Sequence, residues 1–204
     1  IKVSRFAATT VIEYLEAFDK LHKQGMTKLI LDLRGNPGGY LDAATHLADE
    51  FLDGKKLIVY TKGKARPRAE YFADQPGGFE TGKLVVLIDE GSASASEILS
   101  GALQDWDRAT IVGRRSFGKG LVQEQYDLGD RSALRLTVAR YYTPLGRSIQ
   151  RSYKNGHNSY FEDITKRFVH GNNIIADSIN NDTSKIYKTR SGKKLYGSGG
   201  ILPD

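Results

Sequence analysis

Two residue types suited to acyl-transfer chemistry stand 25 positions apart, Ser94 and Lys119. Ser94 is the middle of three alternating serines in GSASASE, residues 91–97, which separates an apolar pentapeptide from an amphipathic segment. A serine at such a strand-to-helix turn is exposed at the edge of a sheet, beside helix amides that can stabilise an oxyanion. The same letters also fit a helix cap, with Ser92 or Ser94 as N-cap and Glu97 completing a capping box. The two roles can coexist.

Lys119 is flanked by two glycines in RSFGKG, residues 115–120, and leads into a segment containing Gln123. A lysine that acts as a general base must be neutral, which requires removal from water. We therefore expect Lys119 to meet the serine beneath an apolar lid, with neither Asp89 nor Glu97 paired with its amine. An exposed turn lysine is the ordinary alternative.

Residues 113–119 also fit the pattern GxxxxGK of a phosphate-binding loop. That loop needs a Ser or Thr after the lysine and a helix whose N-terminus faces the phosphates. Here Gly120 follows, and residues 121–126 have the composition of a strand. Both requirements fail, so the pattern does not support nucleotide hydrolysis.

A third segment, DLRGNPGG at residues 32–39, follows another apolar run. A glycine-rich turn after a buried strand can aim backbone N–H groups at a developing negative charge. It can equally be a tight strand-to-helix connection. The motif alone leaves both possibilities open.

Hydrophobic periodicity predicts the elements that would position these segments. Strand–turn–helix units in series indicate an α/β fold with helices packed on a largely parallel sheet. The polar stretch 62–82 is predicted to be a loop or flap. The predicted helices are 11–22, 41–52 and 95–106, and the predicted strands are 29–33, 56–61, 84–88, 110–112, 121–126 and 133–142.

Composition excludes several functional classes. The chain has no cysteine and only four scattered histidines, so a thiolate nucleophile or a metal site has no support. The net charge of +6 is spread along the chain without a nucleic-acid-binding motif, and no apolar run could span a membrane. The chain opens with Ile1 instead of Met, which suggests a fragment of a longer protein.

Three long stretches resemble the carboxyl-terminal processing peptidases, or tail-specific proteases, a family of Ser-Lys enzymes. They are LILDLRGNPGGYLDAATHLADEFL, GSASASEILSGALQDWDRATIVG and RSFGKGLVQ, and their order and spacing agree with the family. YYTPLGRSIQ and the closing GGILPD are similar as well. The resemblance implies a ClpP/crotonase-like ββα-spiral core over residues 1–150. A polar C-terminal appendage, residues 151–204, would return to the core at Gly199–Asp204.

The resemblance also implies a site. Ser94 falls on the family's nucleophile, Lys119 on its general base and Gln123 on the residue that orients the lysine. The oxyanion hole would combine the Ala95 amide with one amide of the glycine turn. Asp105 matches a structurally important acidic position outside the catalytic set. The two candidate turn glycines are Gly38 and Gly39. No cofactor or metal is implied.

The implied activity is that of a serine endopeptidase acting on polypeptide C-termini in the periplasm or cell envelope of a bacterium. No PDZ domain, which such peptidases usually carry, is recognisable in this sequence, so the chain resembles a truncated core whose own activity is in question. A homo-oligomer is left open. The alternative is a peptide-binding scaffold of the same fold that performs no chemistry.

Overall fold

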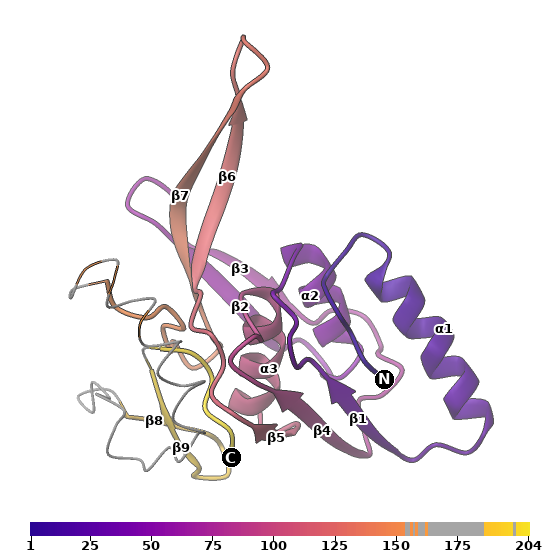
Figure 1. Ribbon diagram of the computed structural model, residues 1–204. Coiled ribbons are helices and arrows are strands. Elements are labelled where there is room, and N and C mark those ends of the chain that lie inside the picture. The colour runs from indigo at the N-terminus through magenta and orange to yellow at the C-terminus, as the bar shows by residue number, and fades with distance from the viewer. Residues whose placement is uncertain (154–155, 157, 159–161, 163–185, 198) are drawn as a thin grey trace.

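The computed structural model describes residues 1–153, 156, 158, 162, 186–197 and 199–204. Its body contains a parallel sheet, an antiparallel sheet and three helices, and a long hairpin projects from it (Figure 1). The predicted appendage, residues 151–204, includes residues 163–185, which lie outside the described part of the chain.

The parallel sheet has three strands in the order β1-β4-β5. Its register pairs Leu31 with Val86, and Val86 with Ile111. All three side chains are fully buried, as in parallel sheets generally, because helices cover such sheets. The strands confirm three predicted segments: β1 (Lys28–Asp32), β4 (Lys83–Ile88) and β5 (Thr110–Gly113).

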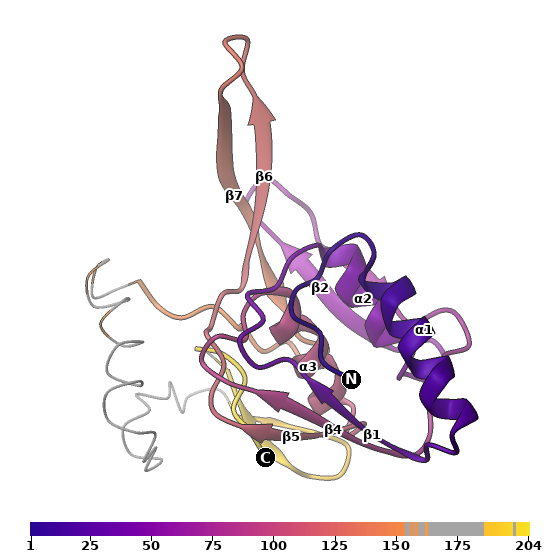
Figure 2. The ribbon, with the colours of Figure 1, turned by 45° about the vertical axis from the view of Figure 1, so that its right-hand side comes forward.

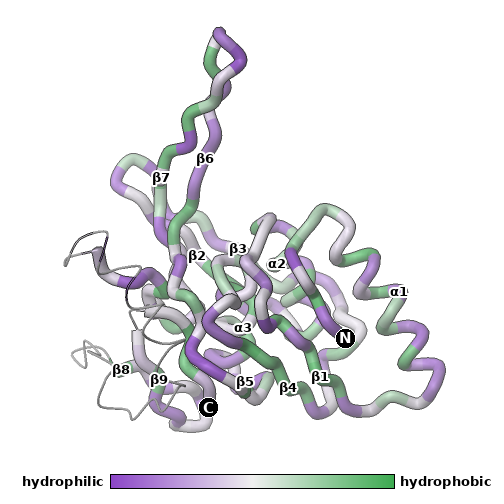
Figure 3. Tube along the Cα trace, in the orientation of Figure 1, coloured by the Kyte–Doolittle hydropathy of each residue, from purple (hydrophilic) through white to green (hydrophobic). Residues whose placement is uncertain are grey.

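Three helices follow the predicted amphipathic segments: α1 (Thr10–Lys23), α2 (Leu41–Asp49) and α3 (Ala95–Asp105). The middle helix ends three residues before the predicted Leu52. Every residue of α3 is buried, so the helix that follows Ser94 runs through the centre of the molecule. Figure 3 shows hydrophobic residues along β4 and α3. No helix in the described ranges combines the length and apolarity needed to cross a bilayer.

The second sheet is antiparallel, which corrects the expectation of a largely parallel sheet. Its strand order is β3-β2-β7-β6. The pairs β2/β3 and β6/β7 are hairpins, which need no crossover helix, whereas parallel strands do. The bounds are β2 (Leu57–Lys62), β3 (Ala69–Phe72), β6 (Leu121–Asp127) and β7 (Ala133–Tyr142).

The predicted loop 62–82 was wrong in part, because it contains β3. That strand has only four residues, is mostly exposed, and carries two large apolar side chains, Tyr71 and Phe72. Neither hydrophobic alternation nor length therefore marks it as a strand.

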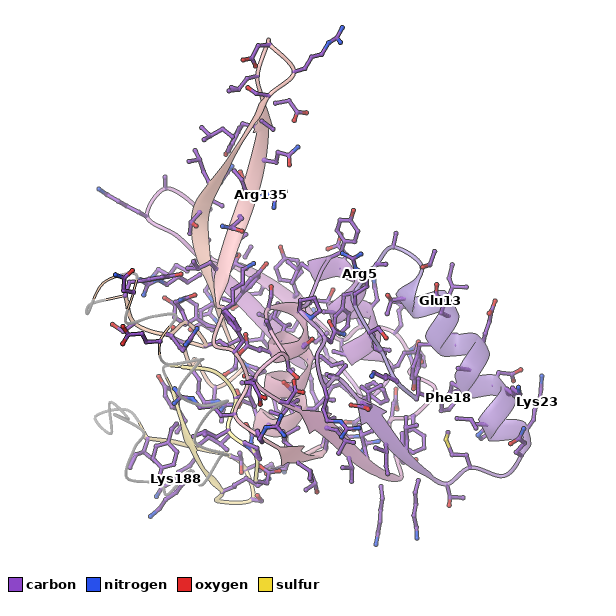
Figure 4. The ribbon with its side chains drawn as sticks, in the orientation of Figure 1. Arg5, Glu13, Phe18, Lys23, Arg135 and Lys188 are labelled. Atoms are coloured by element: carbon purple, nitrogen blue, oxygen red, sulfur yellow. The ribbon has the colours of Figure 1, made fainter. Side chains whose placement is uncertain are left out.

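The β6/β7 hairpin extends well beyond the body in both ribbon views (Figures 1 and 2). Its two faces differ. Tyr126, Leu128, Leu134 and Leu136 are between 41% and 48% exposed, and the pairs Tyr126–Leu134 and Glu124–Leu136 place them on one face. The opposite face carries polar side chains such as Arg135, labelled in Figure 4.

The last residues return to the core, and a small hairpin precedes them. Its strands are β8 (Ile186–Lys188) and β9 (Lys194–Tyr196). Ile201 is only 1% exposed. The Asp204 carboxylate accepts the N–H of Ile111 in β5 at 2.9 Å, and the Gln104 side chain of α3 donates to it at 2.8 Å.

A buried ion pair fastens the C-terminal end of α3. The Arg147 guanidinium lies 2.6 Å from the Asp105 carboxylate, and the two side chains are 2% and 0% exposed. Asp105 also accepts the N–H of Leu145 at 2.9 Å. This contact gives a structural reason for the acidic residue at position 105.

Replacing Asp105 by Ala leaves the buried Arg147 charge without an acidic partner in the described chain, although its hydrogen bond to the Gln104 side chain remains. We expect the free energy of unfolding to fall by about 3–5 kcal/mol, measured by urea denaturation. The matched control is Asp19→Ala, which removes the partner of the exposed Lys23 on α1 (Figure 4) and should change stability by less than about 1 kcal/mol. Equal effects from both variants would contradict a special role for the buried pair.

Candidate active site

Ser94 occupies a strained turn between β4 and α3. Its φ of 55° and ψ of −111° are unusual for a residue with a side chain. Such a conformation costs on the order of 1–3 kcal/mol and persists only where the surroundings enforce it. Strain of this kind is typical of nucleophile turns, because it presents the hydroxyl away from the sheet. Ser94 is also the N-cap of α3 and forms a capping box with Glu97, so the strained conformation occurs in addition to the cap.

The two neighbouring serines fix the turn in place. Ser92 is fully buried and donates to the carbonyl oxygen of Leu33 at 2.8 Å. Ser96 is also fully buried and donates to the carbonyl oxygen of Asn36 at 3.0 Å. Ser94 is half-buried. Two of the three alternating hydroxyls therefore bind the turn to the glycine-rich segment after β1, and the third lies at the surface of the site.

Glu97 connects the serine turn to the lysine segment. One carboxyl oxygen accepts the backbone N–H groups of Ser94 and Lys119, each at 2.8 Å. The other accepts the N–H of Gly118 at 2.7 Å and the hydroxyl of Ser116 at 2.5 Å. Because one oxygen binds both amides, the backbone nitrogens of Ser94 and Lys119 can be no further apart than the sum of two hydrogen bonds.

Burial raises the pKa of the Glu97 carboxyl above its ordinary value. The four donated hydrogen bonds oppose this, because they favour the charged form. The side chain is fully buried and its four partners come from two segments of the chain. The capping box expected of Glu97 is confirmed by its contact with the Ser94 N–H. No motif in the sequence indicates that Glu97 also binds the lysine segment.

Lys119 is half-buried. Glu97 contacts its main-chain amide, and no acidic side chain of the described residues forms an ion pair with its amine. Neither Asp89 nor Glu97 pairs with this amine in the described chain. The expected enclosure beneath an apolar lid is not complete, since Lys119 stays partly exposed. Asp89 instead accepts the N–H of Gly35 at 2.8 Å and so supports the glycine-rich turn.

Glycines let the lysine segment pack closely. At Gly120, a Cβ would lie 2.7 Å from the backbone nitrogen of Gln150, whose side chain accepts the Gly120 N–H at 2.9 Å. Gly118 has a φ of +89° and lies against Arg151. These two residues therefore set the path of the backbone on both sides of Lys119.

The glycine turn lies directly against the serine turn. A Cβ on Gly38 would come within 2.8 Å of the Ser94 Cβ and 2.9 Å of the Ala95 nitrogen. The N–H of Gly38 donates to the Asn36 side chain at 2.9 Å. Within the described part of the chain, the N–H groups of Ala95 and Gly39 donate to no protein acceptor. The residue after Ser94 and the residue after Gly38 thus each carry an unused amide.

Gln123 lies at the base of β6 and is exposed. In the described residues its side chain makes no hydrogen bond, so the structure does not bring it onto Lys119.

Asn36 is a site residue that was not predicted from the sequence. It is fully buried and donates to the carbonyl oxygen of Val3 at 2.8 Å, and its position inside the GNPGG motif was the available signal.

A cavity of about 870 Å³ lies between α2 and β3, away from Ser94 and Lys119. Five of its thirteen lining residues are acidic, and one of them, Asp49, accepts backbone N–H groups from the facing loop. No group of acidic and histidine side chains in the described ranges is arranged to hold a metal ion. The arrangement around Ser94 is therefore the best-formed candidate for chemistry.

Comparison with known proteins identifies the family of this chain. Residues 1–157 match Peptidase family S41. The carboxyl-terminal-processing protease of Picosynechococcus sp. is 43% identical over 152 residues, 74% of this chain and 36% of that protein. The carboxy-terminal-processing protease of Bartonella bacilliformis is 54% identical over 122 residues, 59% of this chain and 28% of that protein.

A solved structure, the photosystem II D1 C-terminal processing protease, has a TM-score of 0.67 and 41% identity. The match covers 73% of this chain and 38% of that one. The chain thus spans roughly a third of the length of these relatives. The relatives are called C-terminal processing proteases, and the expected α/β core is confirmed. The chain belongs to peptidase family S41.

Glu97→Gln tests the carboxyl that connects the two segments. The amide would turn an NH₂ group toward two of the four donors, and each unmatched donor costs about 1–3 kcal/mol of folding free energy. We expect a matching loss of stability in urea denaturation. The control is Glu13→Gln on the exposed face of α1, which should leave stability unchanged.

The difference in stability between the wild type and Glu97→Gln should depend on pH. Because the pKa of Glu97 is raised above 4.5 in the folded state, the folded protein keeps a proton that the unfolded chain loses. The wild type should therefore lose part of its stability advantage over Glu97→Gln as the pH rises above 4.5. An advantage that grows with pH would contradict this assignment.

Proposed function

We propose that this chain is the catalytic core of an endopeptidase that cleaves proteins near their C-termini, with Ser94 as nucleophile and Lys119 as general base. The observation that carries the proposal is the single Glu97 carboxyl that binds the backbone amides of both residues. A serine in a strained strand-to-helix turn, next to a lysine without an acidic partner in the described chain, suits base-assisted nucleophilic attack.

The proposed reaction is acyl transfer. Neutral Lys119 takes the proton of the Ser94 hydroxyl while the oxygen attacks a peptide carbonyl carbon. As the tetrahedral intermediate collapses, the C–N bond breaks and the leaving amine receives the proton from Lys119. Water, deprotonated by the same lysine, then hydrolyses the acyl-enzyme and releases Ser94.

The oxyanion hole is proposed to combine the N–H groups of Ala95 and Gly39. Both are unused in the described chain, whereas the N–H of Gly38 is engaged by Asn36. The contribution of Gly38 is then space: with no side chain, it allows the turn to approach Ala95. Backbone amides fixed in this way are effective because they need no reorganisation when charge develops.

Gln123 is assigned the role of orienting Lys119 in the substrate complex. Its exposed amide lies on β6, the strand that the lysine segment enters. The half-buried state of Lys119 supports the further proposal that substrate, or a part of the parent protein outside this chain, completes the enclosure of the amine. Exclusion of water from the closed site would favour the neutral base.

Substrate and location follow from the family. The relatives are called C-terminal processing proteases, which supports polypeptide C-termini as substrates. We propose a bacterial periplasm or cell envelope as the location, and a homo-oligomer remains one possible assembly. The rival function, a scaffold that binds peptide without cutting it, has no observation in its favour, since Ser94, Lys119 and Gln123 are all present.

Ser94→Ala and Lys119→Ala test the proposed function. In the chain extended by the upstream region of its parent protein, each should lower the rate of cleavage of an unfolded protein substrate by about 10⁴-fold or more. The double variant should be no slower than either single one, because the two residues act as a unit. Cleavage is followed by mass spectrometry of the released C-terminal fragments.

Matched controls are Ser132→Ala at the tip of the β6/β7 hairpin and Lys64→Ala in the loop after β2, both exposed residues outside the site. Both should retain the wild-type rate. Turnover that survives loss of both Ser94 and Lys119 would overturn the proposal. A wild-type enzyme that binds the substrate and never cuts it would favour the scaffold.

A further inference from the structure

The C-terminal tail, residues 199–204, lies against the segment that carries Lys119. Ile201 makes two contacts with one residue of that segment: its carbonyl oxygen accepts the N–H of Ser116 at 3.0 Å, and its own N–H donates to the Ser116 hydroxyl at 2.6 Å. Its side chain is 1% exposed and lies beside Gly101 of α3. The tail therefore touches both the lysine segment and α3, the helix that follows Ser94.

Ser116 passes this contact on to the site. Its hydroxyl accepts from Ile201 and donates to the Glu97 carboxyl at 2.5 Å. Because the Ile201 N–H binds the Ser116 hydroxyl oxygen, the hydroxyl hydrogen is left to point at the Glu97 carboxyl. The tail therefore fixes the direction in which Ser116 donates. The same carboxyl binds the amides of Ser94 and Lys119. An unbroken hydrogen-bonded path thus leads from Ile201 to both proposed catalytic residues.

Close packing makes this path sensitive to small changes. Gly200 has a φ of +99°, and a Cβ there would lie 2.6 Å from the carbonyl oxygen of Ser116 and 2.8 Å from its hydroxyl. Its N–H donates to the carbonyl oxygen of Ile149 at 2.9 Å, which holds the tail at this depth. Any side chain at position 200 would push Ser116 away from the tail.

We propose that the tail, through Ser116, is a positioning element of the active site that sets the alignment of Lys119 with Ser94. The inference rests on the proposed function and adds to it residues outside the segment 1–157 that matches the family. Ser116, Gly200 and Ile201 are positioning residues, because they act on the reacting groups only through Glu97. It follows that a core ending at residue 150 would have a misaligned site.

The test uses reaction with a fluorophosphonate, in which the Ser94 oxygen displaces fluoride from phosphorus and Lys119 takes the proton. The variants Gly200→Ala and Ser116→Ala are compared with the wild type in the same extended chain. The maximal rate of inactivation should fall by about 10- to 100-fold, as small misplacements of reacting groups do. The half-saturating concentration should stay within about twofold, because the binding surface is unchanged.

Gly197→Ala is the matched control. It makes the same change nearby in the chain, where a Cβ would meet the Tyr187 ring at 3.3 Å and the Ser148 nitrogen at 3.8 Å but not Ser116, and it should react as the wild type does. A second readout is amide hydrogen exchange in the peptide 116–120. It should accelerate in both test variants and not in the control.

The outcomes separate the two proposals. If Gly200→Ala does not fold, Ser116→Ala, which removes one hydroxyl, decides the question. Wild-type inactivation rates in a folded Ser116→Ala, with reaction abolished in Ser94→Ala, would overturn the positioning role and leave the proposed function standing. A wild-type enzyme that reacts as fast as Ser94→Ala would overturn both.

Discussion

The site depends on one buried carboxyl with four hydrogen-bond donors. Glu97 has no contact with water, and its donors come from the serine turn and from the segment 116–119. A buried carboxyl without hydrogen-bond donors would lower the stability of the fold. The serine turn and the segment 116–119 must therefore both stay in place around Glu97. The backbones of Ser94 and Lys119 lie close together because both donate hydrogen bonds to the Glu97 carboxyl. The proposed reaction itself does not use this carboxyl.

The rest of the fold supports this contact from three directions. The buried helix α3 places Glu97 one turn after Ser94, and the strands β4 and β5 direct the chain into and out of the site. The glycine turn after β1 closes one side, since the backbone carbonyl oxygen of Asn36 accepts hydrogen bonds from the Ala93 N–H and the Ser96 hydroxyl of the serine turn. The tail closes the other side at Ser116. Segments from both ends of the chain are therefore needed for a single rigid site.

Much of this could be predicted from the sequence. The helices α1 and α3 have strong hydrophobic periodicity, and the parallel strands are short apolar runs with clear boundaries. The GSASASE and FGKG motifs contain the proposed nucleophile and base. The antiparallel sheet was not predictable in the same way, because β3 has a weak apolar pattern and strand direction depends on pairing. The role of Ser116 was also hidden, since a serine in a polar turn has no signal that reveals its partner 85 residues later.

The central claim is that one serine, activated by Lys119, reacts at this site. Peptide mapping by mass spectrometry after treatment with a fluorophosphonate tests it most directly. The account predicts a single phosphonyl adduct on Ser94 in the wild type, and its loss in Lys119→Ala at equal time and concentration. An adduct on another serine, or one on Ser94 that forms as fast without Lys119, would contradict the account.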